Sequence, residues 1–421
     1  MLKRITIFTA GSLGDIQPGL VLGKGLQEAG YQVLLTAPQN FARLSQEHGL
    51  PFHALRGDVQ QIMAGETGRK FIETGGGNPI QSIISMRKMI GPIATQMVED
   101  ALEACREADA LISLAVFAPF GKTVAEIRQI PLINIEPTPL LPTGDFPAPG
   151  WPVQRDLGRI LNRLSGTAML QVIWQWYRPF VNDFRARFKM KPLHGADFYR
   201  TLASTPLLGA YSASVIPRPA DWTDNAQITG YWFQDEVRKW QPSVELETFL
   251  DEGEPPVYIG FGSMAGRNPE HFTRIVLEAL ANSGRRGILA TGWGGMDVLS
   301  VPKDVFVIDS APHGWLFPRT AAVVHHGGAG TTAEGLRAGV PTVIVPFIVD
   351  QLFWGKRVQA MGAGPKPIQA KKLTASNLTD AILAATSDVQ MKERAEIIGK
   401  AIRAEDGLGS AVAAVKRYLE A

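Results

Sequence analysis

Two series of short apolar runs, one in each half of the chain, alternate with longer stretches of helical pattern. Runs of four to six apolar residues are typical of strands buried on both faces of a parallel sheet. Strands that alternate with helices form βαβ units. We therefore predict an α/β protein with two Rossmann-like, doubly wound parallel-sheet domains facing a cleft. The expected strands are Ile5–Ala10, Val33–Thr36, Ala110–Ala115, Leu132–Ile135, Val257–Phe261, Gly287–Ala290, Val305–Ile308, Ala321–Val324 and Thr342–Val345.

The segment between the two series, Gln234–Pro256, is polar, acidic and contains proline, which indicates a linker with a short helix. The predicted organisation is an N-terminal domain at 1–233, a linker at 234–256, a C-terminal domain at 257–400 and a C-terminal helix at 401–421. A helix is expected from Pro18 to Ala29, and a mobile loop over Gly57–Asn78. A chain of 421 residues is long enough for two domains.

Composition excludes few classes of protein. The net charge of +2 gives no overall attraction to nucleic acid. The single cysteine, Cys105, allows no internal disulfide, which fits a reducing compartment. Gly11 and Asp15 break the apolar run at the start, so it is too short for a signal peptide, and no apolar stretch approaches the roughly 18 residues of a membrane span. A cytoplasmic location is expected.

A glycine-rich segment follows the fourth expected strand of the second half. It reads VVHHGGAGTTAE over residues 323–334. Glycines let backbone N–H groups approach an anion, and the start of the following helix adds free donors and a positive dipole end. Thr331 and Thr332 are expected to cap that helix and donate hydroxyls, His326 to donate to a phosphate, and Glu334 to accept from ribose. The alternative is a tight turn with a satisfied pair of core histidines.

Asp350 and Gln351 favour the ligand-binding interpretation, because they follow the next strand at its carboxyl end. They should lie beside His326 and offer both acceptors and donors to sugar hydroxyls. The N-terminal turn, GSLG over residues 11–14, lacks the third glycine of the dinucleotide fingerprint, and the next strand ends at Thr36 rather than at an acid. A nucleotide-sugar site is therefore favoured over NAD or ATP.

The same segments resemble the family 1 UDP-glycosyltransferases of the GT-B fold. The likeness is greatest to the sterol 3-beta-glucosyltransferase branch, which is akin to bacterial antibiotic glycosyltransferases. It rests on GSLGDIQP (Gly11–Pro18), Val215–Trp232, YIGFGSM (Tyr258–Met264) and the LFP, HHGGAGTT, AGVPT and DQ elements of Ala311–Gln351. Ser310 and Ala329 stand where plant secondary-metabolism enzymes have tryptophan, which favours the bacterial or fungal sterol branch. Leu13 replaces the usual arginine of this branch.

The resemblance implies that the C-terminal domain binds a UDP-sugar and the N-terminal domain a hydrophobic acceptor. The UDP-sugar is then a substrate, and no cofactor is implied. The C-terminal helix is expected to cross back to the N-terminal domain. The donor-binding residues implied are Ser12, Ser263, Ala311, His313, His326, Gly328, Ala329, Gly330, Thr331, Glu334, Asp350 and Gln351.

Inverting transfer needs a base for the acceptor hydroxyl, and Asp15 is the candidate. Related plant enzymes have histidine at this position, and the sterol branch has aspartate. The alternative role for Asp15 is an N-cap of the helix after Pro18. Many glycosyltransferases hold the diphosphate with a metal bound to an Asp-x-Asp motif, which this sequence does not contain. We therefore expect no metal site, with the helix dipole at Thr331 and His326 stabilising the diphosphate.

The acceptor is less constrained. A sterol-like alcohol is favoured, the alternative is a polyketide, macrolide or carotenoid, and a non-catalytic nucleotide-sugar-binding scaffold is the non-enzymatic possibility. Residues 151–192 combine aromatic and basic side chains, with Arg155, Arg159 and Arg163 at helical spacing. This stretch could contact a membrane surface peripherally through Trp174, Trp176, Tyr177 and Phe180. Alternatively, these rings line the acceptor pocket or pack in the core.

Overall fold

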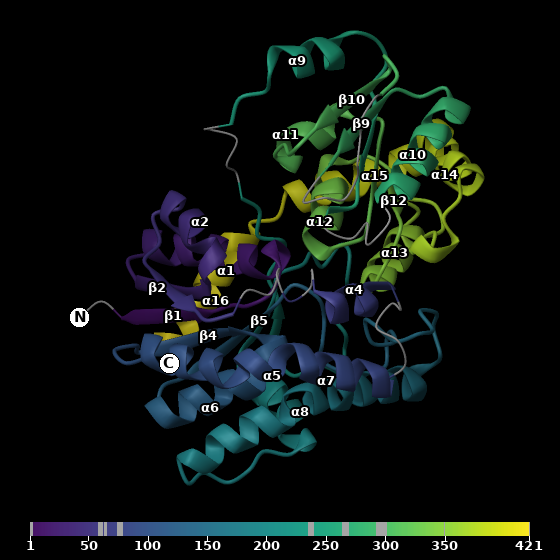
Figure 1. Ribbon diagram of the computed structural model, residues 1–421. Coiled ribbons are helices and arrows are strands. Elements are labelled where there is room, and N and C mark those ends of the chain that lie inside the picture. Colours follow the sequence, from purple (N-terminus) through teal and green to yellow (C-terminus); the bar gives the residue numbers. More distant parts are fainter. Residues whose placement is uncertain are drawn as a thin grey trace.

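The chain forms two α/β domains, each built around one parallel sheet, and they lie one above the other in Figure 1. All nine predicted strands are present, and the predicted fold class is confirmed. The computed structural model describes residues 3–57, 62, 65–73, 79–234, 240–262, 269–291, 301–348 and 350–420.

The N-terminal sheet has seven parallel strands in the order β3-β2-β1-β4-β5-β6-β7. Three of its strands were not predicted. β3 is a partly exposed edge strand, and β6 and β7 have only three residues each, so none of them produces a long apolar run. The strands are β1 (Arg4–Phe8), β2 (Gln32–Pro38), β3 (Phe52–Leu55), β4 (Ala110–Leu114), β5 (Leu132–Glu136), β6 (Leu207–Gly209) and β7 (Ala226–Ile228).

Helices cover both faces of this sheet. The buried side chains of α1 share one core with the C-terminal helix, and those of α5 to α8 fill the other core. The helices are α1 (Leu13–Glu28), α2 (Ala42–Glu47), α4 (Glu66–Glu73), α5 (Pro79–Ala104), α6 (Ala118–Arg128), α7 (Arg159–Arg187) and α8 (Gly195–Ser204), with short 3-10 turns at Gln39–Phe41 and Ala115–Phe117.

Three local predictions in this domain need correction. α1 begins at Leu13 rather than at Pro18, because Ser12 and Asp15 together cap its first turn. The stretch predicted as a loop over residues 57–78 contains helix α4, and much of the remainder lies outside the described residues. Arg155 precedes α7, so it does not continue the helical face of Arg159.

The C-terminal sheet has five parallel strands in the order β10-β9-β8-β11-β12. The predicted short linker helix is α9 (Val244–Asp251), which begins at the N-cap Ser243. The strands are β8 (Val257–Gly260), β9 (Gly287–Ala290), β10 (Val305–Ile308), β11 (Ala322–His325) and β12 (Thr342–Ile344). The helices are α10 (Pro269–Ser283), α11 (His313–Leu316), α12 (Ala329–Ala338), α13 (Gln351–Ala360), α14 (Ala375–Ser387), α15 (Val389–Arg403) and α16 (Gly407–Glu420), with 3-10 turns at Phe317–Arg319 and Ala370–Lys372.

The end of the chain joins the two domains. α15 packs against α12 of the upper domain, whereas α16 packs against α1 of the lower one, so both ends of the chain lie on the N-terminal domain (Figure 1). Glu405 between these helices accepts a hydrogen bond from Ser212 Oγ at 2.5 Å. A single buried cluster includes Val215 of one domain and Trp354 of the other. The domains therefore share buried apolar surface.

Candidate active site

Asp15 lies in the first turn of α1, just beyond the carboxyl end of β1. Its Oδ2 accepts hydrogen bonds from the Ser12 backbone N–H at 2.8 Å and from Ser12 Oγ at 3.0 Å. Burial raises the pKa of Asp15 to about 6, although the two bonds from Ser12 oppose this. The carboxylate therefore has the basicity that a general base needs near neutral pH, and it also caps its own helix.

Gly11 makes room for this carboxylate. Its φ of +133° is rarely adopted by residues with a side chain, and a Cβ added to it would lie 2.2 Å from Asp15 Oδ2. The sequence analysis also singled out Ser12 and Leu13 in this turn. Ser12 uses its N–H and hydroxyl on Asp15, and Leu13 exposes its apolar side chain.

A group of aromatic rings lies beneath Asp15. The Tyr177 ring lies 5.7 Å from that of Phe117 and 5.1 Å from that of Phe120, and Phe117 in turn lies 5.7 Å from Phe8. Burial raises the pKa of Tyr177, and the charge of Asp15 adds to this rise, so the phenol and the carboxylate are neighbours. These rings therefore form a buried apolar cluster, with the Tyr177 phenol oxygen as its polar group.

The turn between β11 and α12 has the geometry of an anion site. Gly328 is the N-cap of α12, so Gly328, Ala329, Gly330 and Thr331 carry the N–H groups of its first turn. A Cβ added to Gly330 would meet no described atom within 4 Å, which leaves open space in front of this turn. A diphosphate placed there would meet free backbone donors and the positive end of the helix dipole.

The two histidines before this turn differ. His325 is fully buried, and its Nδ1 accepts from the Gly327 N–H at 3.0 Å, so it is a core residue. His326 is only half-buried, and its Nδ1 has no hydrogen-bond partner among the described residues. Burial lowers the pKa of His326 to about 4, so the ring is neutral at pH 7. The interpretation as a pair of core histidines therefore applies to His325 alone.

Thr331 and Thr332 do not cap α12 as predicted. Both lie inside its first turns, and Thr332 is fully buried with its Oγ1 donating to the Gly328 carbonyl at 2.9 Å. This hydroxyl is unavailable to a ligand. Thr331 is half-buried and remains a candidate.

The start of α11 lies beside α12. Ala311 precedes His313, whose ring stacks on Phe317 at 4.3 Å between centroids. Burial lowers the pKa of His313 to about 4, and His326 adds to this effect, so the two rings are neighbours. A Cβ added to Gly314 would lie 3.7 Å from Glu334 Oε2. The predicted nucleoside residues and the predicted phosphate residues therefore share one rim.

Asp350 and Gln351 begin α13, at the carboxyl end of β12. Gln351 is buried, and its Oε1 accepts from the backbone N–H groups of Phe347 at 2.7 Å and Ile348 at 3.1 Å. Its amide nitrogen is thereby left as the group that can face a ligand. Burial raises the pKa of Asp350, and a hydrogen bond from Thr138 opposes this rise.

The structure brings the candidate base and the candidate sugar-binding pair together. The charge of Asp350 contributes to the raised pKa of Asp15, although the two residues are more than 300 positions apart. Ser263, another predicted donor contact, lies outside the described residues. The adjacent Gly262 does reach the site, since a Cβ added to it would lie 3.7 Å from His326 Cε1.

The sequence analysis missed two residues of this region, Thr138 and Tyr177. Thr138 follows β5 directly, so its position at the carboxyl end of a strand could have identified it. Tyr177 was not singled out: it was one of four rings expected either to contact a membrane or to line the acceptor pocket or pack in the core. Trp174, Trp176 and Tyr177 are in fact buried, so the prediction that they contact a membrane is wrong and the alternative of core packing is confirmed.

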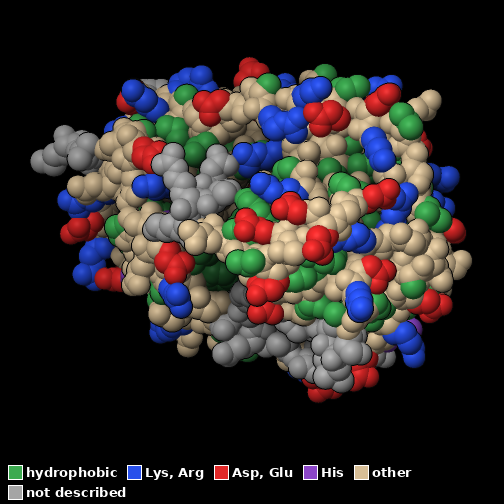
Figure 2. Space-filling view, turned by 90° about the horizontal axis from the view of Figure 1, so that it is seen from above, with side chains coloured by type: hydrophobic (Ala, Val, Ile, Leu, Met, Phe, Trp, Pro, Cys, Tyr) green, Lys and Arg blue, Asp and Glu red, His purple; other side chains and the backbone are tan. Residues whose placement is uncertain are grey.

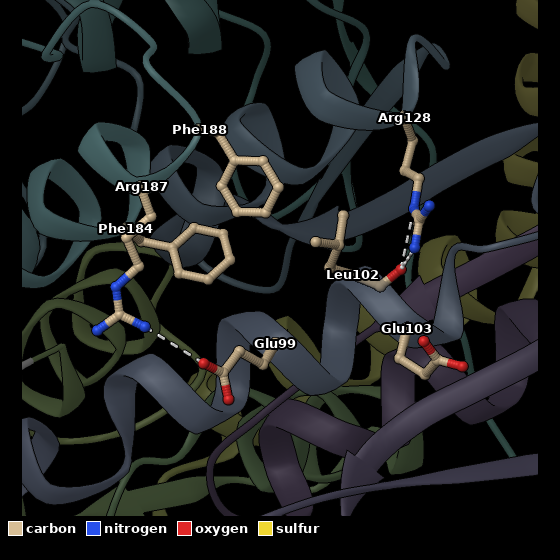
Figure 3. Close-up of a pocket in the computed structure, with 7 residues that line it drawn as sticks. All are labelled: Glu99, Leu102, Glu103, Arg128, Phe184, Arg187 and Phe188. Atoms are coloured by element: carbon tan, nitrogen blue, oxygen red, sulfur yellow. Dashed lines mark hydrogen bonds and ion pairs between the residues drawn. The ribbon is translucent and has the colours of Figure 1, made fainter.

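A surface pocket of about 390 Å³ lies elsewhere, between the carboxyl ends of α5, α6 and α7 (Figure 3). Phe184 and Phe188 form its apolar side, and Arg187 pairs with Glu99 at 3.3 Å across it. These helix ends lead toward the amino ends of β4 and β5, the opposite side of the sheet from Asp15. The pocket is therefore separate from the candidate site.

Comparison with known proteins identifies the family. Residues 5–142 match the glycosyltransferase family 28 N-terminal domain, and residues 276–407 match the erythromycin biosynthesis protein CIII-like C-terminal domain. A sterol 3-beta-glucosyltransferase of Arabidopsis thaliana is 37% identical over 99% of this chain, which spans 66% of that enzyme. One of Cryptococcus neoformans is 34% identical, and this chain spans 27% of it. The O-mycaminosyltylonolide 6-deoxyallosyltransferase of Streptomyces fradiae is 35% identical over 98% of its length.

The expected likeness to the sterol branch is confirmed, and this branch includes a plant sterol enzyme at least as similar as the fungal one. Among solved structures, the glycosyltransferase of kitacinnamycin matches over 100% of this chain and 100% of that one, with a TM-score of 0.74 and 19% identity. The calicheamicin glycosyltransferase CalG4 matches with a TM-score of 0.73 and 17% identity, over 100% of this chain and 98% of that one. The chain belongs to the GT-B glycosyltransferases, in the family that includes sterol 3-beta-glucosyltransferases and bacterial antibiotic glycosyltransferases.

Proposed function

We propose that this glycosyltransferase moves glucose from UDP-glucose to a hydroxyl of a hydrophobic, sterol-like acceptor, with inversion and without a metal ion. The observation that carries this proposal is the hydrogen bond from Thr138 of the N-terminal domain to Asp350 at 2.8 Å. It places the candidate sugar-binding carboxylate over the strand ends of the sheet where Asp15, the candidate base, also lies. The start of α12, the candidate anion site, lies at the neighbouring strand end in the domain of Asp350.

In the proposed step, the Asp15 carboxylate accepts the proton of the acceptor hydroxyl while the oxygen attacks C1 of the sugar. The bond from C1 to the diphosphate oxygen breaks, and its electron pair stays on the diphosphate. The first turn of α12 and a ring N–H of His326 stabilise the developing negative charge. Attack from the face opposite the diphosphate converts an α-linked donor into a β-linked product.

The choice of UDP rests on Glu334. This carboxylate lies beside Gly314 in α11, next to His313, where the nucleoside is expected. A carboxylate can accept from both hydroxyls of a ribose, whereas the deoxyribose of TDP offers only one. Two of the similar structures contain TDP, which makes it the competing donor. Direct comparison of Kd for UDP and TDP tests this choice.

A sterol-like acceptor is supported by relatives in plants and fungi. The second candidate, a polyketide or macrolide, is supported by the Streptomyces fradiae relative, which this chain matches over nearly its whole length. A screen of sterols, macrolide aglycones and carotenoids with labelled UDP-glucose separates them. Failure of every acceptor, together with no hydrolysis of the donor, would instead favour a non-catalytic binding scaffold.

Peripheral membrane contact remains part of the proposal, but through other residues. α5 and α7 run parallel, since Arg87 contacts Gln175 and Glu99 contacts Arg187. Near their amino ends lie five exposed apolar side chains, which could enter a bilayer surface. They are Ile80 (69% exposed), Ile84 (62%), Ile160 (77%), Leu161 (55%) and Leu164 (56%).

Liposome co-sedimentation tests this contact. Ile160→Glu should reduce the fraction bound, and Val389→Glu, at a similarly exposed apolar residue of the C-terminal domain, should not. Equal binding of both variants and the wild type would contradict the proposal.

No helix in the described part of the chain is long and apolar enough to cross a membrane. Elsewhere, positive and negative side chains are interspersed over the face shown in Figure 2. We propose a cytoplasmic location with this peripheral contact.

A further inference from the structure

The carboxylate of Asp350 is held by the opposite domain. Thr138 Oγ1, from the N-terminal domain, donates to Asp350 Oδ2 at 2.8 Å. The indole Nε1 of Trp354 lies 3.3 Å from the same oxygen and 3.3 Å from Thr138 Oγ1. Oδ2 is therefore engaged by two side-chain donors, and no side chain among the described residues donates to Oδ1; the remaining partner of the carboxylate is the backbone N–H of Asp350 itself.

Thr138 is itself held firmly. It lies two residues beyond Glu136, which ends β5 and is 1% exposed. The Glu136 carboxylate accepts from the Leu140 backbone N–H at 3.0 Å and from the Tyr211 hydroxyl at 2.7 Å. These bonds fix the backbone on both sides of Thr138, so its hydroxyl is presented to the other domain from a rigid loop.

The helix that begins after Asp350 is docked on the same domain at two further points. The Phe353 ring lies 5.6 Å from that of Phe146, which belongs to the loop that follows Thr138. Arg357 Nε, one and a half turns along α13, donates to the Val215 carbonyl at 3.1 Å. The N-terminal domain therefore sets the position of α13 as well as the orientation of Asp350.

We propose that Thr138 is a positioning residue for the transferred sugar. By donating to Oδ2 across the domain boundary, it orients Asp350 so that Oδ1 accepts from a sugar hydroxyl beside the Gln351 amide nitrogen. Sugar recognition is then complete only while the domains are closed. The UDP portion, in contrast, is held by α12 and His326 within one domain. This inference rests on the proposed UDP-sugar donor.

The readout that separates these two portions is the ratio of Kd for UDP-glucose to Kd for UDP, measured by calorimetry on the full chain. Thr138→Val keeps the side-chain shape and removes the hydroxyl. A hydrogen bond to a charged group contributes roughly 1.5–3 kcal/mol, so the ratio should rise about tenfold or more, with Kd for UDP little changed. Thr138→Ser restores the hydroxyl and should return the ratio to within about twofold of the wild type.

Thr143→Val is the matched control. Thr143 lies in the same loop and also donates to an aspartate, Asp221 at 2.7 Å, but within its own domain. Its loss should leave the ratio unchanged. The inference is overturned if Thr138→Val leaves the ratio unchanged, if it weakens both ligands equally, or if Thr138→Ser is equally impaired. A wild-type chain that binds neither ligand would instead overturn the proposed donor, and this inference with it.

Discussion

The acid limb of the pH–rate profile should belong to Asp15. Burial raises its pKa to about 6, and a general base acts only when it is ionised. Activity should therefore be lost as pH falls through about 6. With that pKa, about nine-tenths of the carboxylate is ionised at pH 7 and about one-tenth at pH 5. We expect kcat/KM, which reports the free enzyme, to fall about tenfold between these values.

Asp15→Asn provides the test at a fixed pH. The amide oxygen can still accept from the Ser12 N–H, so the first turn of α1 should remain capped. Removal of a general base costs about 10²–10⁴ in rate. We expect kcat to fall by that factor, the acid limb near pH 6 to disappear, and Kd for UDP-glucose to stay within about twofold. Steady-state kinetics with the best acceptor and calorimetry with the donor measure these quantities.

Ser12→Ala checks the origin of the pKa. The Ser12 hydroxyl donates to the ionised carboxylate at 3.0 Å and lowers its pKa, so its removal should move the acid limb to higher pH. The reasoning is refuted if Asp15→Asn retains near-normal kcat, or if it keeps an acid limb with an unchanged midpoint. An acid limb that moves to lower pH in Ser12→Ala would refute the assigned cause.

Three other predictions concern the metal, a buried carboxylate and the Gly11 turn. Transfer should persist in excess EDTA, and loss of turnover that manganese restores would contradict the metal-independent step. Burial raises the pKa of Glu136 from 4.5 to about 7, so between these pH values the folded chain holds a proton that the unfolded chain has lost. The free energy of unfolding therefore falls as the pH rises through this range. Glu136→Gln should therefore match the wild type in thermal melts near pH 4 and be more stable at pH 8, by on the order of 1–3 kcal/mol. Gly11→Ala should lower both Tm and kcat because its Cβ would lie 2.2 Å from Asp15 Oδ2, and wild-type kcat would contradict the close contact.

The interior strands could be predicted from the sequence because burial on both faces imposes a continuous apolar run. Val257–Gly260 and Ala322–His325 are fully buried in this way. The missed strands lie at or near the sheet edge, where short length and partial exposure remove that pattern, as in Phe52–Leu55. Helix starts were misjudged where a residue other than the expected one is the N-cap, as with Ser12 at α1 and Gly328 at α12.

The residues of the donor region were predictable because each follows the carboxyl end of a strand in its own domain. His326 and Asp350 both satisfy this rule. The partner of Asp350 was not predictable, since Thr138 comes from the other domain and no spacing in the sequence specifies how the domains pack. A different ambiguity applies to Tyr177. An aromatic stretch of helix fits both a protein core and a membrane surface, so the sequence could not show that Tyr177 is buried.

Domain packing also bears on the timing of the reaction. The pKa of Asp15 rises from its usual 3.8 to about 6, chiefly through burial, and the charge of Asp350 from the other domain adds a smaller part of that rise. An open chain would therefore hold a weaker base facing water. In the proposed mechanism, closure would increase the basicity of Asp15 as it brings Thr138 to Asp350 and completes the proposed sugar-binding pair. We expect the base to be strongest in the arrangement that would hold the sugar, which would limit wasteful attack by water in an open chain.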